Sequence, residues 1–387
     1  MGQLFSRTLG ASPTPPLLQL PVEVLLSITN QLSSSPESIV ALSLTCKPLF
    51  IALERDVADI RGKYRHSVLA LLEKDLGDRF FYCSTCCQLH RFSPWWNPTT
   101  TEHTAYCNTK YNRFYCHTRQ LFNPNPANSP YKLYYVHARL VMNRHLYGAP
   151  KGLSLESLAK PTRARSWAGG PLWLQCPSAR IIGDELFLRV THTLEGTAAT
   201  LRDAIDEGRY CICMHVATDP VDFVRRSRDG LYRIPELETP EGEKQGSGPS
   251  WSPFRVCREA PGFCTICLTD YTTTVERAEV REVVQSMIAK NGIHFGPFVN
   301  GWRVTISTYH QLGRCRDTED WRWVALVGGK VGQPGGDTSP GSLACPGRDM
   351  ALYPPGVVRQ KWRAEDHRPK ESSEGVVPLD YGLEDNL

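Results

Sequence analysis

The sequence predicts a mixed α+β protein, in which a small N-terminal bundle of helices precedes a larger, irregular domain with short antiparallel strands. Three observations predict this class. Apolar residues recur at helical spacing from residue 17 onward, as amphipathic helices require. Later segments alternate apolar and polar residues or turn at glycine, as strands and hairpins do. A stretch rich in cysteine, tryptophan, tyrosine and proline separates the two patterns.

The composition is that of an ordinary globular protein. Of the 387 residues, 41% are apolar and 22% are charged, and the net charge of +4 is small, so generic nucleic-acid binding is not favoured. The chain has no run of about 18 apolar residues that would predict a membrane-spanning helix. Without a signal peptide, the 14 cysteines are expected in a reducing compartment, where clustered thiols more often hold metal than form disulfides.

The first residues, 1–16, are expected to be a disordered leader. Gly2 and Ser6 fit the N-myristoylation pattern, although so short a pattern also matches by chance. A single acyl chain binds membrane only marginally, and Arg7 alone is no polybasic second signal. We therefore expect the protein in the cytoplasm or the nucleus, with membrane attachment only if Gly2 is acylated.

Residues 17–61 predict three short helices joined by tight turns. Pro21 and Pro36 suit the first turns of two of them, where a missing N–H costs nothing. In the first helix, leucines and isoleucine recur on one stripe, and a second apolar stripe lies beside it. So small a bundle cannot bury all of these side chains, so we expect it to need a partner.

The rest of the chain is predicted from shorter signals. Helices are expected at 64–76 and 131–147, and a hairpin is expected to turn at Gly183-Asp184. Strands are expected at 210–216, 302–308 and 321–327. The composition beyond residue 328 predicts disorder. The expected parts are a leader (1–16), the helical module (17–61), a Cys-rich α+β domain (62–328) and a disordered tail (329–387).

The helical module resembles the F-box. Leu20-Pro21-Val22-Glu23 matches the Leu-Pro-x-Glu start of that motif, and a later helix runs apolar residues into Cys46-Lys47, as the motif does. The whole chain resembles F-box proteins of filamentous fungi, in which a Cys-rich segment follows the F-box. The residues that this resemblance places against the partner are Leu20, Pro21, Leu25, Ile28, Leu32, Leu42 and Leu44.

This resemblance implies binding to the Skp adaptor of a cullin–RING ubiquitin ligase. The chain would be a non-catalytic substrate receptor, with its downstream domain holding an unknown protein client. Amphipathic helices bind partner grooves through anchors at i, i+3 and i+4, which agrees with the excess of leucines. The alternative is that the module only caps the larger domain.

The first group of metal-ligand candidates opens with a Cys-x-x-Cys turn. Such a turn lets two thiolates bind one tetrahedral zinc ion at about 2.3 Å each. Reduced, buried thiols that pack as small apolar groups are the alternative. The predicted ligands are Cys83, Cys86, Cys107 and Cys116, with Cys87, His90, His103 and His117 as competitors.

The second group is Cys213-x-His215 with Cys264-x-x-Cys267. On alternate positions of a strand, Cys213 and His215 would point to the same face, and the later turn would supply the other two ligands. Cys211 and Cys257 are spare thiols. The following Leu268-Thr269-Asp270-Tyr271 resembles the Thr-Asp-aromatic strand of the fungal F-box proteins. Four protein ligands leave no position for water, so the zinc would be structural.

No motif in the chain predicts catalysis. The Cys213-x-His215 pair lacks the cysteines that a RING finger needs shortly after it, and the glycines at 328–332 lack the Gly-Lys-Ser/Thr of a phosphate loop. There is no Gly-x-Ser-x-Gly or His-Glu-x-x-His motif. Two further readings stay open: an F-box scaffold that acts outside a ligase, and a zinc-dependent nucleic-acid-binding protein with a localised basic face.

Overall fold

The structure is a computed structural model of the chain, which divides into two compact units. Unit 1 comprises Met1–Phe122, Pro130–Lys160 and Arg314–Asp320, and unit 2 comprises Asn123–Ser129, Pro161–Gly313 and Trp321–Leu387. The residues that the structure describes are 19–53, 64–84, 86–100, 121–123, 130–165, 171–206, 210–217, 232–238, 254–284, 294–327 and 352–366.

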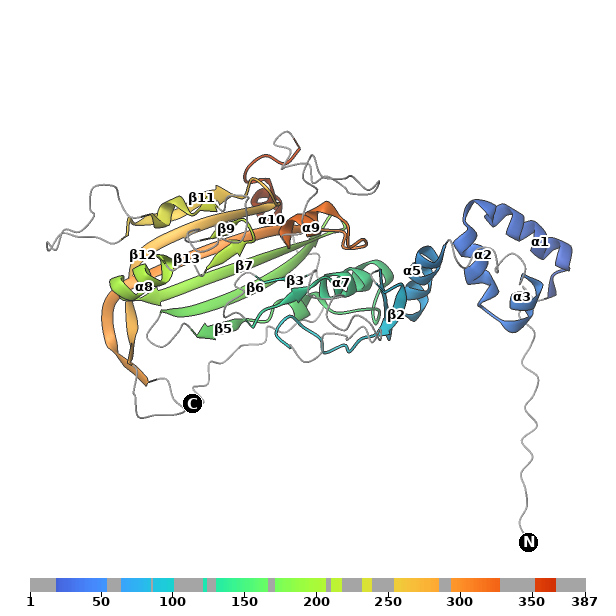
Figure 1. The fold of residues 1–387 in the computed structure, drawn as a ribbon, viewed down its shortest axis with the longest axis horizontal. Coiled ribbons are helices and arrows are strands. Elements are labelled where there is room, and N and C mark those ends of the chain that lie inside the picture. Colours follow the sequence, from blue (N-terminus) through green and yellow to red (C-terminus); the bar gives the residue numbers. More distant parts are fainter. Residues whose placement is uncertain are drawn as a thin grey trace, which may run out of the picture. The chain divides into compact units, whose positions relative to one another are not determined.

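Unit 1 begins with three short helices in the segment where the sequence predicts three (Figure 1). Pro36 lies in the first turn of the second of them, and Pro21 directly precedes the first. A small core of Val40, Leu53 and Val68 joins these helices to the next one, α5. The helices are α1 (Val22–Gln31), η2 (Leu32–Ser34), α2 (Pro36–Ser43), α3 (Lys47–Ala52) and α5 (Arg65–Leu76).

The remainder of unit 1 is assembled around a buried carboxylate. Glu73 of α5 is fully buried and accepts hydrogen bonds from Arg139 Nε and Nη2 at 2.9 and 2.6 Å, and from the backbone N–H of Tyr82 at 3.0 Å. Because an unpaired buried charge is costly, this network fixes α5 against its neighbours. The other elements of unit 1 are β1 (Phe80–Cys83), β2 (Gln88–Arg91), β3 (Leu121–Phe122), β4 (Leu133–Tyr134), α7 (Tyr135–Tyr147) and η4 (Leu155–Leu158).

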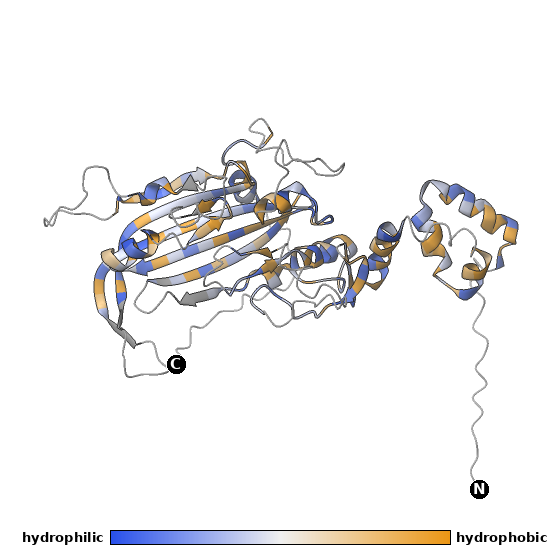
Figure 2. Cartoon of the chain, in the orientation of Figure 1, coloured by the Kyte–Doolittle hydropathy of each residue, from blue (hydrophilic) through white to orange (hydrophobic). Residues whose placement is uncertain are grey.

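Unit 2 contains a six-stranded antiparallel sheet in the order β11-β12-β13-β7-β6-β5. Its strands carry alternating apolar and polar residues (Figure 2), because one face is packed on a core. Four of the strands have eleven or more residues and β13 has twenty, so the prediction of only short strands was wrong. The strands are β5 (Thr162–Arg165), β6 (Leu172–Ile182), β7 (Glu185–Gly196), β11 (Cys257–Phe263), β12 (Thr269–Val284) and β13 (His294–Gly313).

The predicted hairpin turns where the sequence places it. Gly183 and Asp184 link β6 to β7 with φ of +56° and +60°. Positive φ at both central residues is the geometry of a type I′ turn, which matches the twist of the flanking strands. A second, three-stranded sheet has the order β10-β9-β8. The other elements beside the large sheet are α8 (Ala198–Asp206), β8 (Cys211–Cys213), β9 (Val216–Ala217), β10 (Tyr232–Arg233) and η5 (Pro235–Leu237).

The predicted disordered tail contains a helix. In α10 (Val357–Asp366), Val358 and Trp362 are buried against Phe187 and Tyr309 of the sheet. Only two side chains of this helix are buried, one turn apart, and they are buried only because the sheet offers them an apolar surface. The surrounding Gly, Pro, Asp and Ser residues hide so short a signal, and for this reason the prediction of a tail at 329–387 was wrong for this segment.

Two further expectations need correction. The segment predicted as a strand at 321–327 forms helix α9 (Trp321–Leu326), in which Trp323 and Leu326 are buried three residues apart; the β-propensity of Trp and Val had favoured a strand. The predicted domain 62–328 is instead divided between the two units, because a run of composition does not show which segments pack together. None of the described helices is both long and apolar enough to cross a bilayer.

Candidate metal centres and the N-terminal apolar surface

A tight hairpin positions the first half of the second group. Cys213 is the last residue of β8, and it pairs across the turn with Val216 of β9. His215 lies in the turn itself. The two ligands are therefore not on alternate positions of one strand, as predicted from the sequence, but at the tip of a two-stranded hairpin. The short turn still brings both side chains to one place.

The turn between β11 and β12 positions the second half. The backbone N–H groups of Ile266 and Cys267 donate to Cys264 Sγ at 3.3 and 3.4 Å. The turn is closed by Cys264 N–H to Thr269 O at 2.9 Å and Thr269 N–H to Cys267 O at 2.8 Å. Two amide donors aimed at one sulfur stabilise its thiolate form, which is the form that binds metal.

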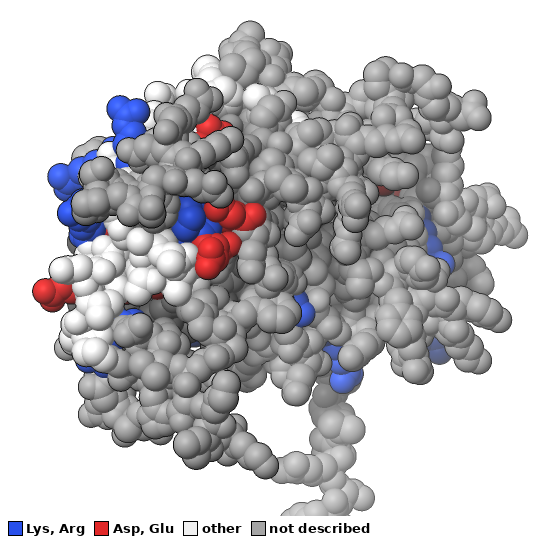
Figure 3. Space-filling view, turned by 60° about the vertical axis from the view of Figure 1, so that its left-hand side comes forward, with Lys and Arg blue, Asp and Glu red and all other residues white. Residues whose placement is uncertain are grey.

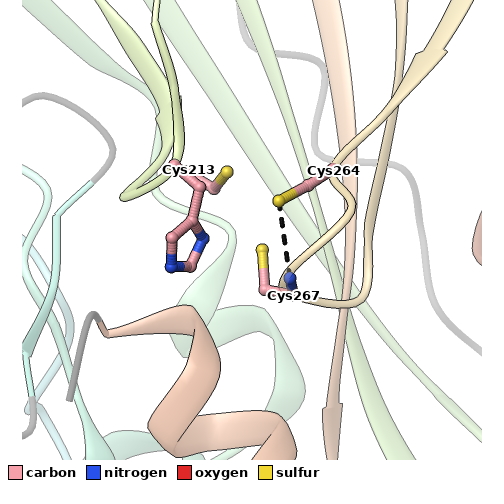
Figure 4. A group of neighbouring side chains, drawn as sticks. Cys213, Cys264 and Cys267 are labelled. Atoms are coloured by element: carbon pink, nitrogen blue, oxygen red, sulfur yellow. Dashed lines mark hydrogen bonds between the residues drawn. The ribbon is translucent and has the colours of Figure 1, made fainter. Parts of the chain in front are cut away.

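The two halves meet in a buried cluster within unit 2. Among the described residues, the candidate ligand atoms of Cys213, His215, Cys264 and Cys267 all lie within 4.8 Å of one another. The three cysteines are almost wholly buried, and their sulfur atoms point toward a common centre (Figure 4). Cys211 and Cys257, the spare thiols, are outside this group. The four residues that lie together are those that the sequence analysis places in the second group.

The three buried thiols of the cluster differ in how readily they lose a proton. Burial raises the pKa of Cys213 and of Cys267 well above the usual thiol range. Hydrogen bonds from these two thiols hold the pKa of Cys264 far below it. The neighbouring thiols therefore stabilise one thiolate, that of Cys264. If all three cysteines are thiolates, their buried negative charge needs a cation beside it.

The donor set fits a metal ion. His215 Nδ1 is buried and has no hydrogen-bond partner in the described part of the chain, and a nitrogen that coordinates a cation needs none. Three thiolates and an imidazole together make a four-ligand set, which closes a tetrahedral shell and leaves no position for a substrate. This arrangement can hold an ion and tie the β8–β9 hairpin to the β11–β12 turn.

The first group has three members among the described residues. The structure brings Cys83, Cys86 and His90 within 4.8 Å of one another in unit 1, with 3.6 Å between the two sulfur atoms. Cys83 ends β1 and His90 lies in β2, where the register places both on one face of the hairpin. The sequence analysis named His90 only as a competing ligand. Its position seven residues after Cys83 is the feature of the sequence that points to it. The predicted ligands Cys107 and Cys116, like His103 and His117, lie outside the described residues.

Cys87 does not join that group. Its sulfur lies 3.0 Å from His66 Nε2, and the His66 ring also contacts the Tyr82 hydroxyl through Nδ1. Cys87 also adopts a positive φ of 52°. The two adjacent cysteines therefore have different surroundings.

None of the seven predicted adaptor-binding residues is buried. Leu20, Pro21 and Leu44 are exposed, and Leu25, Ile28, Leu32 and Leu42 are half-buried. Leu42 packs partly against the small core of the bundle. Four apolar residues that the sequence analysis did not name as binding residues are also exposed: Val22, Val24, Leu26 and Ile51. Two of them, Val22 and Leu26, lie on the second apolar stripe that the sequence shows in the first helix.

Comparisons of the chain with family models, with curated proteins and with solved structures gave no match.

Proposed function

We propose that the chain is the substrate-receptor subunit of a Skp/cullin/F-box-type ubiquitin ligase, in which α1–α3 bind the Skp adaptor. The observation that carries this proposal is the apolar surface of these helices. Large apolar side chains exposed in such number on and beside three short helices are typical of a surface that a partner covers. The exposed fractions are 37% for Leu20, 53% for Val22, 42% for Val24, 45% for Leu26, 45% for Leu44 and 60% for Ile51.

The magnitudes are consistent with docking. Fully burying one such side chain contributes roughly 1.5–3 kcal/mol, and these six are about half exposed. Covering them therefore contributes roughly 4–9 kcal/mol in total. Association costs about 4–15 kcal/mol in lost freedom. The six residues alone offset the lower part of that range, so we expect the half-buried Leu25, Ile28 and Leu32 to contribute as well.

We propose zinc as the ion of the buried Cys/His cluster. Thiolate and imidazole ligands suit Zn²⁺, and a four-ligand set without an open position is typical of structural zinc sites. Zinc would hold the β8–β9 hairpin against the end of the large sheet. Cys83, Cys86 and His90 offer three ligands of the same chemistry, and we propose zinc for that group too.

In this proposal the chain makes and breaks no bonds. Its work is to hold a protein client near the ligase, since tethering raises the effective concentration of the reacting groups toward the millimolar range. A nucleic-acid binder would need a localised basic face. On the described part of the face in Figure 3, basic and acidic side chains lie side by side. In the large sheet, Arg303 pairs with Glu195 at 2.5 Å and with Glu276 at 3.3 Å.

The test is co-purification of the full chain with a Skp-type adaptor and a cullin. In Val22→Glu/Leu26→Glu, two exposed residues one helical turn apart become charged. Because neither side chain is buried, we expect the thermal transition to shift little and adaptor capture to fall at least tenfold. Leu20→Ala/Pro21→Ala should weaken capture in the same direction.

Trp95→Ser is the matched control, since Trp95 is 83% exposed and lies outside α1–α3. It removes exposed apolar surface elsewhere and should leave adaptor capture unchanged. Undiminished capture by the double-glutamate variant would overturn the proposal. Capture of the adaptor without cullin would instead favour a scaffold that acts outside a ligase.

A further inference from the structure

Helix α10 lies on one face of the large sheet, and the sheet contacts both ends of the helix as well as its middle. Val358 and Trp362 are the two buried residues of this helix. They pack with Phe187 of β7, Leu268 and Tyr309 of β13. These three apolar residues form the floor of the contact.

A carboxylate of the sheet binds the N-terminal end of the helix. Asp270 of β12 accepts from the backbone N–H groups of Gly356 at 3.1 Å, Val358 at 2.8 Å and Arg359 at 3.1 Å. The first N–H groups of a helix have no partner within it, and the helix dipole favours negative charge beside them. Because Asp270 contacts only backbone atoms here, it can bind the start of a helix of another sequence in the same way.

An arginine of the sheet binds the C-terminal end. Arg180 of β6 donates to the backbone carbonyl of Trp362 at 2.9 Å and pairs with Asp366. Its guanidinium lies 4.5 Å from the centre of the Trp362 ring, and that of Arg189 lies 5.5 Å from it. Cations over an indole ring are favourable, and positive charge suits the C-terminal end of a helix.

The groups that contact the two ends share one face of the sheet. Arg180 is directly opposite Phe187, and Tyr309 is directly opposite both Arg189 and Asp270. Directly opposite residues of a ladder lie on the same face. This face therefore has an apolar floor between a negative group and a positive group, an arrangement that matches the dipole of a helix in one direction only. We call it the α10 surface.

We propose that the α10 surface is the client site of the receptor, and that a short amphipathic helix of the client binds there in place of α10. Helices that bind in this way present anchors at regular helical spacing. In the chain's own helix the anchors are Val358, Trp362 and Asp366. The client helix would accordingly carry an aliphatic residue, an aromatic residue four positions later and an acidic residue four positions after that. The existence of a client rests on the proposed function.

Helix α10 is a ligand that a client can displace. It has ten residues, and helices so short are marginal on their own, so its order depends on the sheet. Trp362 Nε1 is buried and has no hydrogen-bond partner in the described part of the chain, which is unfavourable. A client helix whose aromatic residue buries no N–H avoids this cost and competes with α10.

The first test is displacement in the full-length chain, with a fluorescein-labelled peptide of residues 352–366 as the probe. Trp362→Ala removes the aromatic anchor of the chain's own helix and frees the surface. By fluorescence anisotropy, we expect this variant to bind the peptide at least tenfold more tightly than the native chain. The peptide that itself carries Trp362→Ala should bind to neither. Equal binding by the native chain and by a folded variant would overturn the proposal.

Two further variants control this measurement. Gln360→Ala is the matched control, since Gln360 lies in the same helix and is exposed, and it should bind the peptide as weakly as the native chain. Asp366→Arg changes an exposed residue of α10 and removes no buried group. It should raise peptide affinity a few-fold, so the test does not depend on the folding of Trp362→Ala.

A charge reversal separates the α10 surface from a non-specific apolar patch. A chain with Trp362→Ala should bind the native-sequence peptide more tightly than the peptide with Asp366→Arg. With Arg180→Glu added to the same chain, we expect the opposite order. Hydrogen exchange in β13 shows whether each chain is folded. An order that does not reverse in a folded chain would contradict recognition by Arg180.

A designed peptide tests the chemistry of the client. It keeps the glycine and the aliphatic, aromatic and acidic positions of α10, with alanine, lysine and glutamine elsewhere. We expect its affinity for the Trp362→Ala chain to lie within a few-fold of that of the native-sequence peptide. A designed peptide that does not bind would show that the surface recognises only the chain's own segment, and would overturn the proposed client.

The outcomes separate the client site from the proposed function. Loss of adaptor capture together with normal peptide binding defeats the proposed function. Normal adaptor capture by a folded Trp362→Ala chain that does not bind the peptide defeats the client site alone. A native dimer that the peptide dissociates would assign the surface to α10 of a second copy, and would overturn the client site as well.

Discussion

The two Cys-x-x-Cys turns share one motif but differ in what surrounds them. Cys264 and Cys267 are fully buried, and a hairpin from elsewhere in unit 2 completes their group. Cys83 and Cys86 lie at the end of a two-stranded hairpin in unit 1, Cys86 is only half-buried, and among the described residues one histidine of the same hairpin completes their group. The motif sets the spacing of two sulfur atoms, and only the distant chain decides whether a closed site forms.

The two turns also differ in what stabilises the structure around them. In unit 2 the Cys/His cluster brings together two turns from different parts of the chain. In unit 1 the hairpin that carries Cys83 is attached through Tyr82 N–H to the buried Glu73, which also pairs with Arg139 and Arg316. We therefore expect unit 2 to depend on its ion and unit 1 to depend more on its buried ion pairs.

The largest expected effect separates the two turns directly. Cys267→Ala should lose one zinc ion per chain and leave unit 2 largely unfolded, because a structural zinc contributes about 10–16 kcal/mol of apparent binding free energy to a domain of about 5–15 kcal/mol stability. Cys83→Ala should lower the melting temperature by less. Metal analysis and thermal unfolding check both, and equal losses from the two variants would contradict the comparison.

A second substitution tests the ion-pair side of the comparison. Burial raises the pKa of Glu73, but the opposing effect of Arg139 and Arg316 is larger. The pKa of this carboxyl therefore lies below its usual value. Glu73→Gln leaves Arg139 buried without its charge partner, which costs about 3–5 kcal/mol. Chemical denaturation should show this loss while the zinc content of the Cys264 cluster is unchanged. Glu276→Gln, which alters an exposed pair, is the control and should change stability little.

A third prediction asks whether the buried turn also holds the C-terminal helix. Three residues beyond Cys267, the buried carboxylate of Asp270 accepts from the backbone N–H groups of Gly356 at 3.1 Å, Val358 at 2.8 Å and Arg359 at 3.1 Å. Asp270→Ala leaves donors of α10 unsatisfied, at a cost of about 1–3 kcal/mol.

We expect hydrogen exchange to become faster in α10 while the zinc content stays at the native value. Unchanged exchange in α10 would show that its burial on Phe187 and Tyr309 suffices without the carboxylate. Loss of zinc in the same variant would show instead that the turn itself had been disrupted.

The smallest expected effect concerns the loss of stability in acid. It tests how much of that loss comes from a buried histidine of the large sheet and not from release of metal. His192 is buried against Trp173, and burial lowers its pKa from 6.5 to about 3. Between these values the unfolded chain binds the proton and the folded chain does not, so stability falls as pH falls. The slope is at most about 1.4 kcal/mol per pH unit. His192→Phe should reduce the slope by that amount in denaturation curves between pH 6 and 4, and an unaltered slope would assign the acid loss to other groups.

Much of the candidate site followed from the sequence, because its ligands lie in two short local motifs. Cys213-x-His215 and Cys264-x-x-Cys267 each place two ligands within one turn of chain, which the spacing shows without a fold. The starts of α1 and α2 at Pro21 and Pro36 and the hairpin at Gly183-Asp184 were equally local. The third member of the first group, His90, was named only as a competitor, since proximity across a hairpin is not visible as a short motif.

What the sequence determined by itself was the backbone preference of short segments and the chemistry of paired ligands, because proline, glycine and Cys-x-x-Cys act over one turn of chain. What only the tertiary structure decided was which of these segments meet. Helix α10 is ordered because its Trp362 lies on Phe187 and Tyr309, and Thr269 reaches His310 because β12 pairs with β13 in one register. Burial and strand pairing bring together residues that are tens to hundreds of positions apart in the sequence, and a local sequence pattern does not predict such contacts.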